Sequence, residues 1–298
     1  MGRIHHEECP VCGKKNINPL LTVTDHSVSK ENFVIWQCAD CSLRFTQDVP
    51  DEASIAAYYN SPDYISHSNT NNGFINKTYQ KVKLYTLEEK AKLIRAKTGK
   101  DTGTLLDMGC GTGAFLNVMV QKGWKVQGIE PDYDARKMAR DLYRLEVDEP
   151  SVLPQLAPGS FDAITLWHVL EHVHHLHGYL AKLKDTLTPD GRLFIAVPNY
   201  QSLDAAVYRL QWAAYDVPRH LYHFSPKALE ELMKRNGLNV VEKKAMWFDS
   251  FYISLLSSKY KNGKPNYFGS IVAGLRSNAL ALIDNDRCSS LIYIIAKA

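Results

Sequence analysis

The residues best suited to chemistry lie in one glycine-rich stretch, residues 105–115. An apolar run there ends around the carboxylate of Asp107 and is followed by three glycines, Gly109, Gly111 and Gly113. Glycines let the backbone approach a ligand closely, and the N-terminus of the helix expected after them presents free N–H groups to a carboxylate or phosphate. The stretch therefore predicts a ligand-binding loop at the end of a buried strand.

A second acid follows the next apolar run. Glu130 comes directly after residues 125–129 and 19 residues after Gly111, a position suited to binding ribose hydroxyls. The glycine pattern also fits a nicotinamide dinucleotide fingerprint, so these residues predict an adenosine-containing cofactor and leave its kind open. A carboxylate at Asp107 would crowd a pyrophosphate, whereas it suits the ammonium group of an amino acid.

Four of the six cysteines form two CxxC pairs, Cys9 with Cys12 and Cys38 with Cys41, separated by 25 residues. Each tight turn points two thiolates at one ion, and two such turns complete the tetrahedral shell that Zn²⁺ prefers. A redox role would normally need only one pair. We therefore expect structural zinc, with no open coordination position for catalysis.

The elements around these motifs change character along the chain. Residues 1–48, poor in apolar side chains, predict a small zinc ribbon, and residues 49–98 a helical cap or linker with a basic helix near 76–97. Residues 99–298 predict strands over 104–108, 125–129, 161–166, 192–197, 238–245 and 291–297. Helices are expected over 114–122, 135–142, 178–187 and 226–236, with a helical insertion within 248–286. This alternation predicts an α/β fold with a mostly parallel sheet.

The composition excludes several classes of protein. The chain has 298 residues, of which 45% are hydrophobic and 22% charged, as in an ordinary globular protein. A net charge of +3 does not call for nucleic acid or an anionic membrane as partner. No apolar run approaches a membrane span and the start lacks a signal-peptide pattern, so we expect a cytoplasmic protein.

Three further segments extend the pattern. Residues 161–164 lead a strand into 167–173, and residues 187–195 predict a helix end, a turn and another strand. In this order and spacing, these segments and 105–115 resemble the class I S-adenosylmethionine-dependent methyltransferases over about residues 104–199. The resemblance implies an enzyme with a Rossmann-like sheet, helices on both faces, and S-adenosylmethionine as cofactor.

The resemblance also assigns roles to residues. The glycine loop with Asp107 would cradle the methionine part of the cofactor, Glu130 would bind the ribose, and Asp148 or Glu149 would meet the adenine. Trp167 and His168 would lie beside the methionine moiety. Candidate cofactor-binding residues are Tyr59, Tyr64, Asp107, Gly109, Gly111, Gly113, Glu130, Trp167 and His168.

Two segments outside residues 104–199 make the resemblance more specific. The cysteine pairs and residues 216–225 resemble a subgroup with an N-terminal zinc ribbon, linked mainly to the modification of sugars and other small metabolites. We therefore expect a small-molecule acceptor, such as a sugar, a nucleotide sugar or a precursor of a cell-surface polysaccharide. The alternatives are an RNA methyltransferase whose ribbon binds RNA, a non-catalytic cofactor-binding scaffold, and a nicotinamide dehydrogenase. The acceptor atom and the oligomeric state stay open.

Methyl transfer also requires a base wherever the acceptor must lose a proton. His172, His220 and His223 are the candidates, because histidine titrates near neutral pH. His220 and His223 lie in an aromatic segment, residues 200–224, that we expect to form a substrate lid. Glu171 among the neighbouring histidines leaves a divalent metal ion open as an alternative.

Overall fold

The computed structural model describes residues 2–59 and 74–298, which divide into two compact units. The first unit comprises Met1–Ile65, Leu170–Leu176 and Ala196–Tyr293, and the second comprises Ser66–Val169, His177–Ile195 and Ile294–Ala298. Neither unit is continuous in sequence. The division into residues 1–48, 49–98 and 99–298 therefore stays a prediction.

The described residues form a seven-stranded sheet in the order β12-β13-β10-β9-β6-β7-β8. Its strands are β6 (Thr104–Met108), β7 (Lys125–Ile129), β8 (Val147–Asp148), β9 (Phe161–Trp167), β10 (Leu187–Pro198), β12 (Leu238–Ala245) and β13 (Ser290–Lys297). Strand β6 pairs in parallel with β7 and β9, and β7 in parallel with β8. The sheet confirms the predicted α/β class; only β8 had no counterpart in the sequence analysis, because two residues are too short for a periodic signal.

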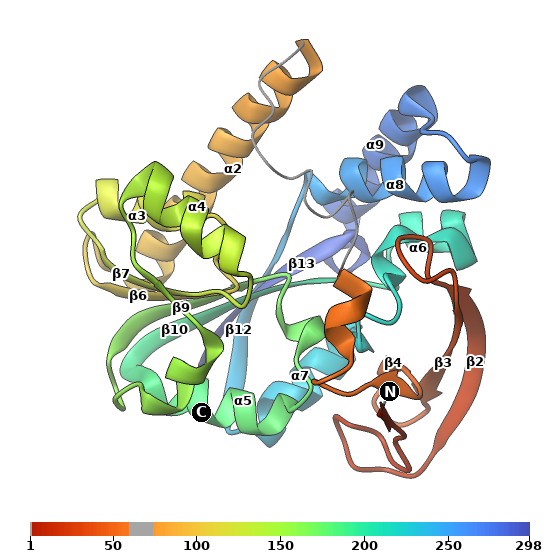
Figure 1. Cartoon of the computed structure of the whole chain (residues 1–298), viewed down its shortest axis with the longest axis horizontal. Coiled ribbons are helices and arrows are strands. Elements are labelled where there is room, and N and C mark those ends of the chain that lie inside the picture. The colour runs from red at the N-terminus through yellow and green to blue at the C-terminus, as the bar shows by residue number, and fades with distance from the viewer. Residues whose placement is uncertain (1, 60–73) are drawn as a thin grey trace. The chain divides into compact units, whose positions relative to one another are not determined.

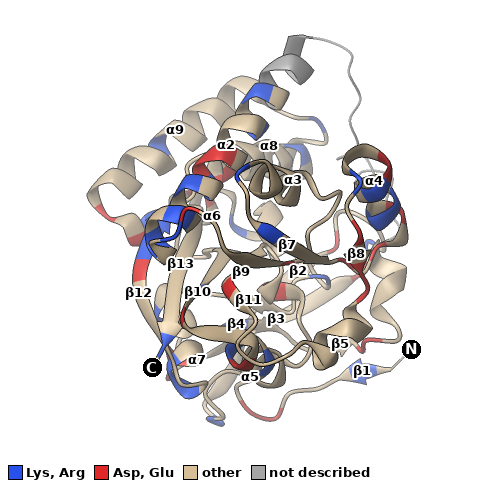
Figure 2. Cartoon of the chain, turned by 90° about the vertical axis from the view of Figure 1, so that its left-hand side faces the viewer, with Lys and Arg blue, Asp and Glu red and all other residues tan. Residues whose placement is uncertain are grey.

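Helices cover both sides of the strands in the second unit. They are α2 (Phe74–Thr98), α3 (Ala114–Gln121), α4 (Tyr133–Tyr143), η2 (Pro150–Gln155) and α5 (Leu176–Thr186), the last beginning in the first unit. Figures 1 and 2 show α2, α3 and α4 on one side of β6, β7 and β9, and α5 on the other. The arrangement agrees with the predicted helices on both faces.

One boundary differs from the sequence prediction. The helix ends at Thr186 and β10 begins at once with the buried Leu187, where we predicted a turn through Pro189 and Gly191. A Cβ on Gly191 would lie 2.8 Å from the side chains of both Leu187 and Thr188. Residues three and four apart in an extended strand are too distant for such contacts, so the backbone bends within this first part of β10.

The first unit contains a second, antiparallel sheet in the order β11-β4-β3-β2. Its strands are β2 (Ile17–Thr24), β3 (Asn32–Cys38), β4 (Arg44–Thr46) and β11 (Tyr222–His223), and a separate pair joins β1 (Arg3–Ile4) to β5 (Val49–Pro50). In β11, Tyr222 pairs with Phe45 of β4. The N-terminal cysteine region therefore shares its sheet with a segment that lies 177 positions further along the chain, at Tyr222 opposite Phe45.

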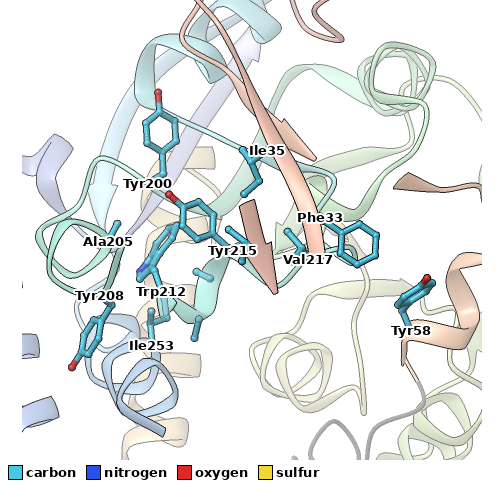
Figure 3. Close-up of a cluster of buried hydrophobic side chains, with 13 residues drawn as sticks. Phe33, Ile35, Tyr58, Tyr200, Ala205, Tyr208, Trp212, Tyr215, Val217 and Ile253 are labelled. Carbon is cyan, nitrogen blue, oxygen red and sulfur yellow. The ribbon is translucent and has the colours of Figure 1, made fainter. Parts of the chain in front are cut away.

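The remaining helices of the first unit surround an aromatic core. They are η1 (Ile55–Tyr59), η3 (Leu170–His172), α6 (Leu203–Tyr208), η4 (Arg209–Gln211), η5 (Ala213–Tyr215), α7 (Pro226–Arg235), α8 (Asp249–Asn262), α9 (Tyr267–Ile283) and η6 (Asn285–Arg287). Figure 3 shows Trp212 and Tyr215 close to Ile35 of β3 in this core. The aromatic side chains expected to form a lid are thus buried as the core of the unit, since each ring removes a large apolar area from water.

Among the helices that the structure describes, none combines the length and the apolar character needed to cross a membrane.

Candidate functional site

The glycine loop of the second unit connects β6 to α3 and has a left-handed backbone. Gly109, Gly111 and Gly113 have φ values of 64°, 54° and 75°. A Cβ on Gly109 would lie 2.6 Å from the side chain of Val169. Glycine is therefore required at this position by both backbone conformation and space, and the first turn of α3 has no side-chain cap.

Asp107 lies inside β6, just before this loop, and is only 1% exposed. The hydroxyl of Thr165 in β9 donates a hydrogen bond of 2.6 Å to its carboxylate. Burial raises the pKa of Asp107 to about 7, against the opposing effects of Thr165 and the positive charge of Lys90. A cationic ligand group placed beside this carboxylate would restore its charge.

Glu130 links the glycine loop to the loop after β7. Its carboxylate accepts hydrogen bonds from the backbone N–H groups of Gly111, at 2.8 Å, and Asp132, at 2.9 Å. Burial raises the pKa of Glu130 above its ordinary value, although both hydrogen bonds oppose the shift. One acid therefore holds two turns at the carboxyl ends of adjacent parallel strands, where α/β sheets bind ligands.

Trp167 ends β9 and contributes a polar atom. Its indole Nε1 is buried and has no hydrogen-bond partner within the described structure. The ammonium group of Lys90, in α2, lies 4.1 Å from the centre of the indole ring, and the ring of Phe115 meets it edge-on at 5.7 Å. An unpaired buried donor beside a cation favours an anionic or carbonyl group of a ligand.

His168, the next residue, has a positive φ of 59°. Such a conformation is uncommon for a residue with a side chain and marks a sharp change of direction directly after the strand.

The first unit has a separate group of titratable side chains around η3. Nδ1 of His172 lies 3.0 Å from the carbonyl oxygen of Arg219 and 2.9 Å from the hydroxyl of Tyr59. Because a carbonyl can only accept, Nδ1 carries the proton and Nε2 keeps the lone pair. Burial lowers the pKa of His172 to about 4, with a smaller contribution from His220. His172 is therefore a neutral imidazole with a fixed tautomer.

His220 packs against His172, with ring centres 4.6 Å apart and nearly perpendicular planes. Its Nδ1 lies 2.8 Å from the carbonyl oxygen of Ala214, so the same argument assigns the proton to Nδ1. Ligand atoms of Glu171, His172 and His220 all lie within 4.8 Å of one another. The set has a donor composition that a divalent metal ion would accept.

His223 has a different environment. It lies in β11, with its ring edge-on to Tyr215 and its Nε2 3.2 Å from the hydroxyl of Thr46. Burial lowers its pKa well below the ordinary histidine value. Its contacts are those of a side chain packed between sheet and core.

Arg219 is a buried cation that links several segments of the first unit. It is 2% exposed and pairs with Asp25 at 3.1 Å and with Asp216 at 2.6 Å. It also donates to the carbonyl oxygen of Tyr58, at 2.7 Å. The sequence analysis treated residues 216–225 only as part of a resemblance and missed this role; an arginine flanked by Asp216 and His220 was the available signal.

The four N-terminal cysteines converge as predicted. Their thiols are buried and all lie within 4.8 Å of one another, with Sγ atoms 3.5 Å apart in the pairs Cys9–Cys41 and Cys12–Cys38. Each CxxC turn has the same hydrogen bond, from Gly13 N–H to the carbonyl of Cys9 and from Ser42 N–H to that of Cys38. Two matching turns with four thiols have the donor set that a structural Zn²⁺ site requires.

Comparison with known proteins decides the family. A model of the methyltransferase domain matches residues 79–243, more than half of the chain. The chain belongs to the methyltransferase domain family. It is an S-adenosylmethionine-dependent methyltransferase, as the glycine loop, Asp107 and Glu130 predict.

Curated relatives align with about half of this methyltransferase. The ubiquinone biosynthesis O-methyltransferase of Burkholderia vietnamiensis is 28% identical over 157 residues, which are 48% of this chain and 67% of that protein. The mitochondrial ubiquinone biosynthesis O-methyltransferase of Mus musculus is 30% identical over 166 residues, 49% of this chain and 44% of that protein.

A solved structure supports the fold alone. It comes from Galdieria sulphuraria, is provisionally assigned as a sarcosine dimethylglycine methyltransferase, and has a TM-score of 0.53 at 16% identity. The match covers 74% of this chain and 88% of that one.

The individual site residues of the methyltransferase stay predictions. Tyr64 lies outside the described residues, and Tyr59, proposed for the cofactor, contacts His172 within the first unit. Thr165 and Lys90 were not predicted from the sequence, the latter because it lies in the basic helix that we expected to be a cap or linker. Both could be found only from the pairing of β6 with β9 and the packing of α2 against β9.

Proposed function

We propose that this methyltransferase acts on a small molecule and methylates a hydroxyl group of a sugar, a nucleotide sugar or a polysaccharide precursor. The observation that carries the proposal is the neutral, tautomer-fixed imidazole of His172. A hydroxyl must lose its proton as it becomes an ether, and a neutral histidine accepts that proton. The curated relatives, which are named as O-methyltransferases, support oxygen as the acceptor atom.

The second unit would bind the cofactor, which supplies an electrophilic methyl group. In this proposal Asp107 pairs with the ammonium group of the methionine part, and Glu130 accepts hydrogen bonds from the ribose hydroxyls. The unpaired Nε1 of Trp167 and the nearby ammonium of Lys90 attract the methionine carboxylate. Burial of these groups strengthens each interaction, because the surroundings screen charge weakly.

In the first unit His172 is the proposed base. It follows Trp167 by only five residues in the chain, directly after the end of β9. The carbonyl of Arg219 orients the ring, so that Nε2 would accept the proton that an acceptor hydroxyl loses. In this proposal His220 packs against the ring of His172, and His223 has a structural role.

The cysteine site would hold zinc in a structural role. Cys9, Cys12, Cys38 and Cys41 fill all four positions of a tetrahedral shell, so no coordination position is left for a substrate. The ion would fix the turns that precede β2 and β4.

The test is a methyl-transfer assay over a panel of sugars, nucleotide sugars and catechols, with S-adenosylmethionine binding measured in parallel by calorimetry. We expect His172→Asn to lower kcat at least a hundredfold on the accepted class without changing cofactor affinity. The matched control is the exposed His175→Asn, which should keep full activity.

Three outcomes would overturn parts of the proposal. Full turnover by His172→Asn would remove His172 as base. Dependence of the zinc-loaded enzyme on added Mg²⁺ or Mn²⁺ would favour a metal ion at Glu171, His172 and His220. Transfer to RNA with no transfer to any small molecule would change the acceptor class.

A further inference from the structure

Helix α9 of the first unit exposes its large apolar side chains. Five of these side chains are more than half exposed: Phe268 (80%), Ile271 (52%), Leu275 (57%), Leu282 (77%) and Ile283 (85%). The first four recur at the spacing of one helix face and continue along the whole helix. A contiguous apolar surface of this kind marks an interaction site.

The inner side of the α8–α9 hairpin, by contrast, buries mostly small and polar side chains. The side chains that α9 buries are small, Ser270, Gly274, Ser277 and Ala281, and α8 buries Ser250, Ser254, Ser257 and Ser258 together with Ile253. Hydroxyl groups lie between the two helices: the Ser250 hydroxyl donates to Oδ1 of Asn278 at 3.0 Å, and Ser270 Oγ, which donates to the Asn266 carbonyl at 2.6 Å, lies 3.3 Å from Ser258 Oγ.

This distribution inverts the usual pattern of a surface helix in water, which buries large apolar residues and exposes polar ones. Small residues and hydroxyl hydrogen bonds between helices, with apolar residues outside, are typical of helices that pack in lipid. A Cβ on Gly274 would lie 2.5 Å from the ring of Phe251, so the helices approach as closely as glycine allows. The hairpin is therefore built to place α9 against an apolar medium.

Basic side chains near this apolar face favour an anionic lipid surface as the apolar medium. Lys261 and Lys264 are exposed in and beside the turn between the helices, and Arg276 is the one charged residue of α9, which contains no acid. Lys261 and Arg276 line a surface hollow of about 270 Å³, together with apolar side chains that include Val207 and Ala273. Two cations at the edge of an apolar face suit a lipid phosphate group.

The dimensions fit a helix that lies in the membrane interface. Seventeen residues make α9 about 25 Å long, with apolar groups at both ends. Figure 2 shows α9 as a largely tan helix, which reflects its near absence of charge. Basic residues flanking an apolar helix face are the pattern of interfacial binding to anionic lipids.

We propose that the α8–α9 hairpin docks on an anionic phospholipid bilayer, with α9 in the interface plane and a lipid phosphate group bound by Lys261 and Arg276. A second copy of the chain fits less well as the occupant, since α9 itself contains no acid and Asp284, the residue after it, already lies 3.7 Å from Arg287. The proposal is independent of the acceptor and of the base.

The experiment is flotation of the full chain with vesicles of phosphatidylcholine alone and of phosphatidylcholine mixed with phosphatidylglycerol. We expect binding to the anionic vesicles, weakened by salt. Phe268→Asp combined with Leu282→Asp should lower the bound fraction at least tenfold. Leu142→Asp, which alters an exposed apolar residue of α4, is the matched control and should bind as the unaltered chain does.

A second variant separates charge from apolar contact. Lys261→Glu combined with Arg276→Glu should remove the preference for anionic vesicles. Circular dichroism and S-adenosylmethionine binding report whether each variant folds. Absence of binding to either vesicle, or equal binding by the Phe268/Leu282 variant, overturns the proposal. A dimer that the same variant dissociates, without vesicle binding, identifies a second copy as the occupant and overturns it too.

Discussion

The two units of this methyltransferase build their sites in opposite ways. In the second unit, Asp107 and the three glycines lie within seven consecutive residues, and Glu130 adds one further loop. In the first unit, the group around His172 draws Tyr59, Arg219 and Asp25 from distant parts of the chain. A cofactor loop can thus be found as a motif, whereas the proposed base depends on contacts between remote segments.

The two units also bury different kinds of titratable side chains. Burial raises the pKa of Asp107 and Glu130 in the second unit and lowers that of His172 and His223 in the first. All four shifts favour the neutral form, as desolvation requires. The exceptions include Arg219, Asp25 and Asp216 of the first unit, which stay charged because they pair with one another. Perturbing each unit separately should therefore give distinct responses.

The largest expected effect comes from the cysteine site. Cys41→Ser should lower the free energy of unfolding of the first unit by more than about 5 kcal/mol, because the zinc ion proposed for the four thiols would contribute its binding free energy directly to folding. Calorimetric unfolding checks this, and the control is the unaltered chain with added zinc. An unchanged melting transition would show that the four thiols do not hold a stabilising ion.

The next effect concerns the buried ion pairs. Arg219→Met should cost about 3–5 kcal/mol of stability, because it leaves Asp25 buried without its cation. The matched control is Arg235→Met, whose surface pair with Glu231 should be worth less than about 1 kcal/mol. Denaturant unfolding measures both changes, and equal losses would contradict the difference in burial.

The third effect tests the second unit. Since the pKa of Asp107 is about 7, its carboxylate must lose a proton before it can pair with the cofactor's ammonium group. The affinity for S-adenosylmethionine should rise up to tenfold per pH unit below pH 7 and level off above it. Calorimetric titration across this range is the measurement. In Asp107→Asn the affinity should be lower and independent of pH; a retained pH dependence would assign it to another group.

The smallest effect is the pH dependence of stability from His172. Its pKa falls from 6.5 in the unfolded chain to about 4 in the folded unit, so between these values only the unfolded chain binds the proton. The stability is full above pH 6.5 and should be lost by about 1 kcal/mol per pH unit as the pH falls toward 4. His172→Asn should reduce this slope in denaturant unfolding, and an unchanged slope would show that His172 is not neutral in the fold.

The sequence predicted the long strands of the large sheet because they alternate with helical segments and most contain several apolar residues. Strands β6, β7 and β12 have the predicted bounds. It did not predict β8 or β11, which are two residues long and exist through pairing with a neighbour. It also placed residues 200–224 in a lid, whereas their aromatic rings form a core. An aromatic-rich sequence is compatible with either a lid or a core, so the sequence could not distinguish them.

By itself the sequence determined what depends on short range: the left-handed glycine loop, the acid after the second strand, and two CxxC turns that point four thiols to one place. Backbone conformation and thiol spacing act over a few residues, so they can be read from the chain. Only the tertiary structure decided the protonated nitrogen of His172, the ion pairs of Arg219, and the apolar outer face of α9. Those properties depend on which remote groups are buried together, since burial and pairing set charge, tautomer and exposure.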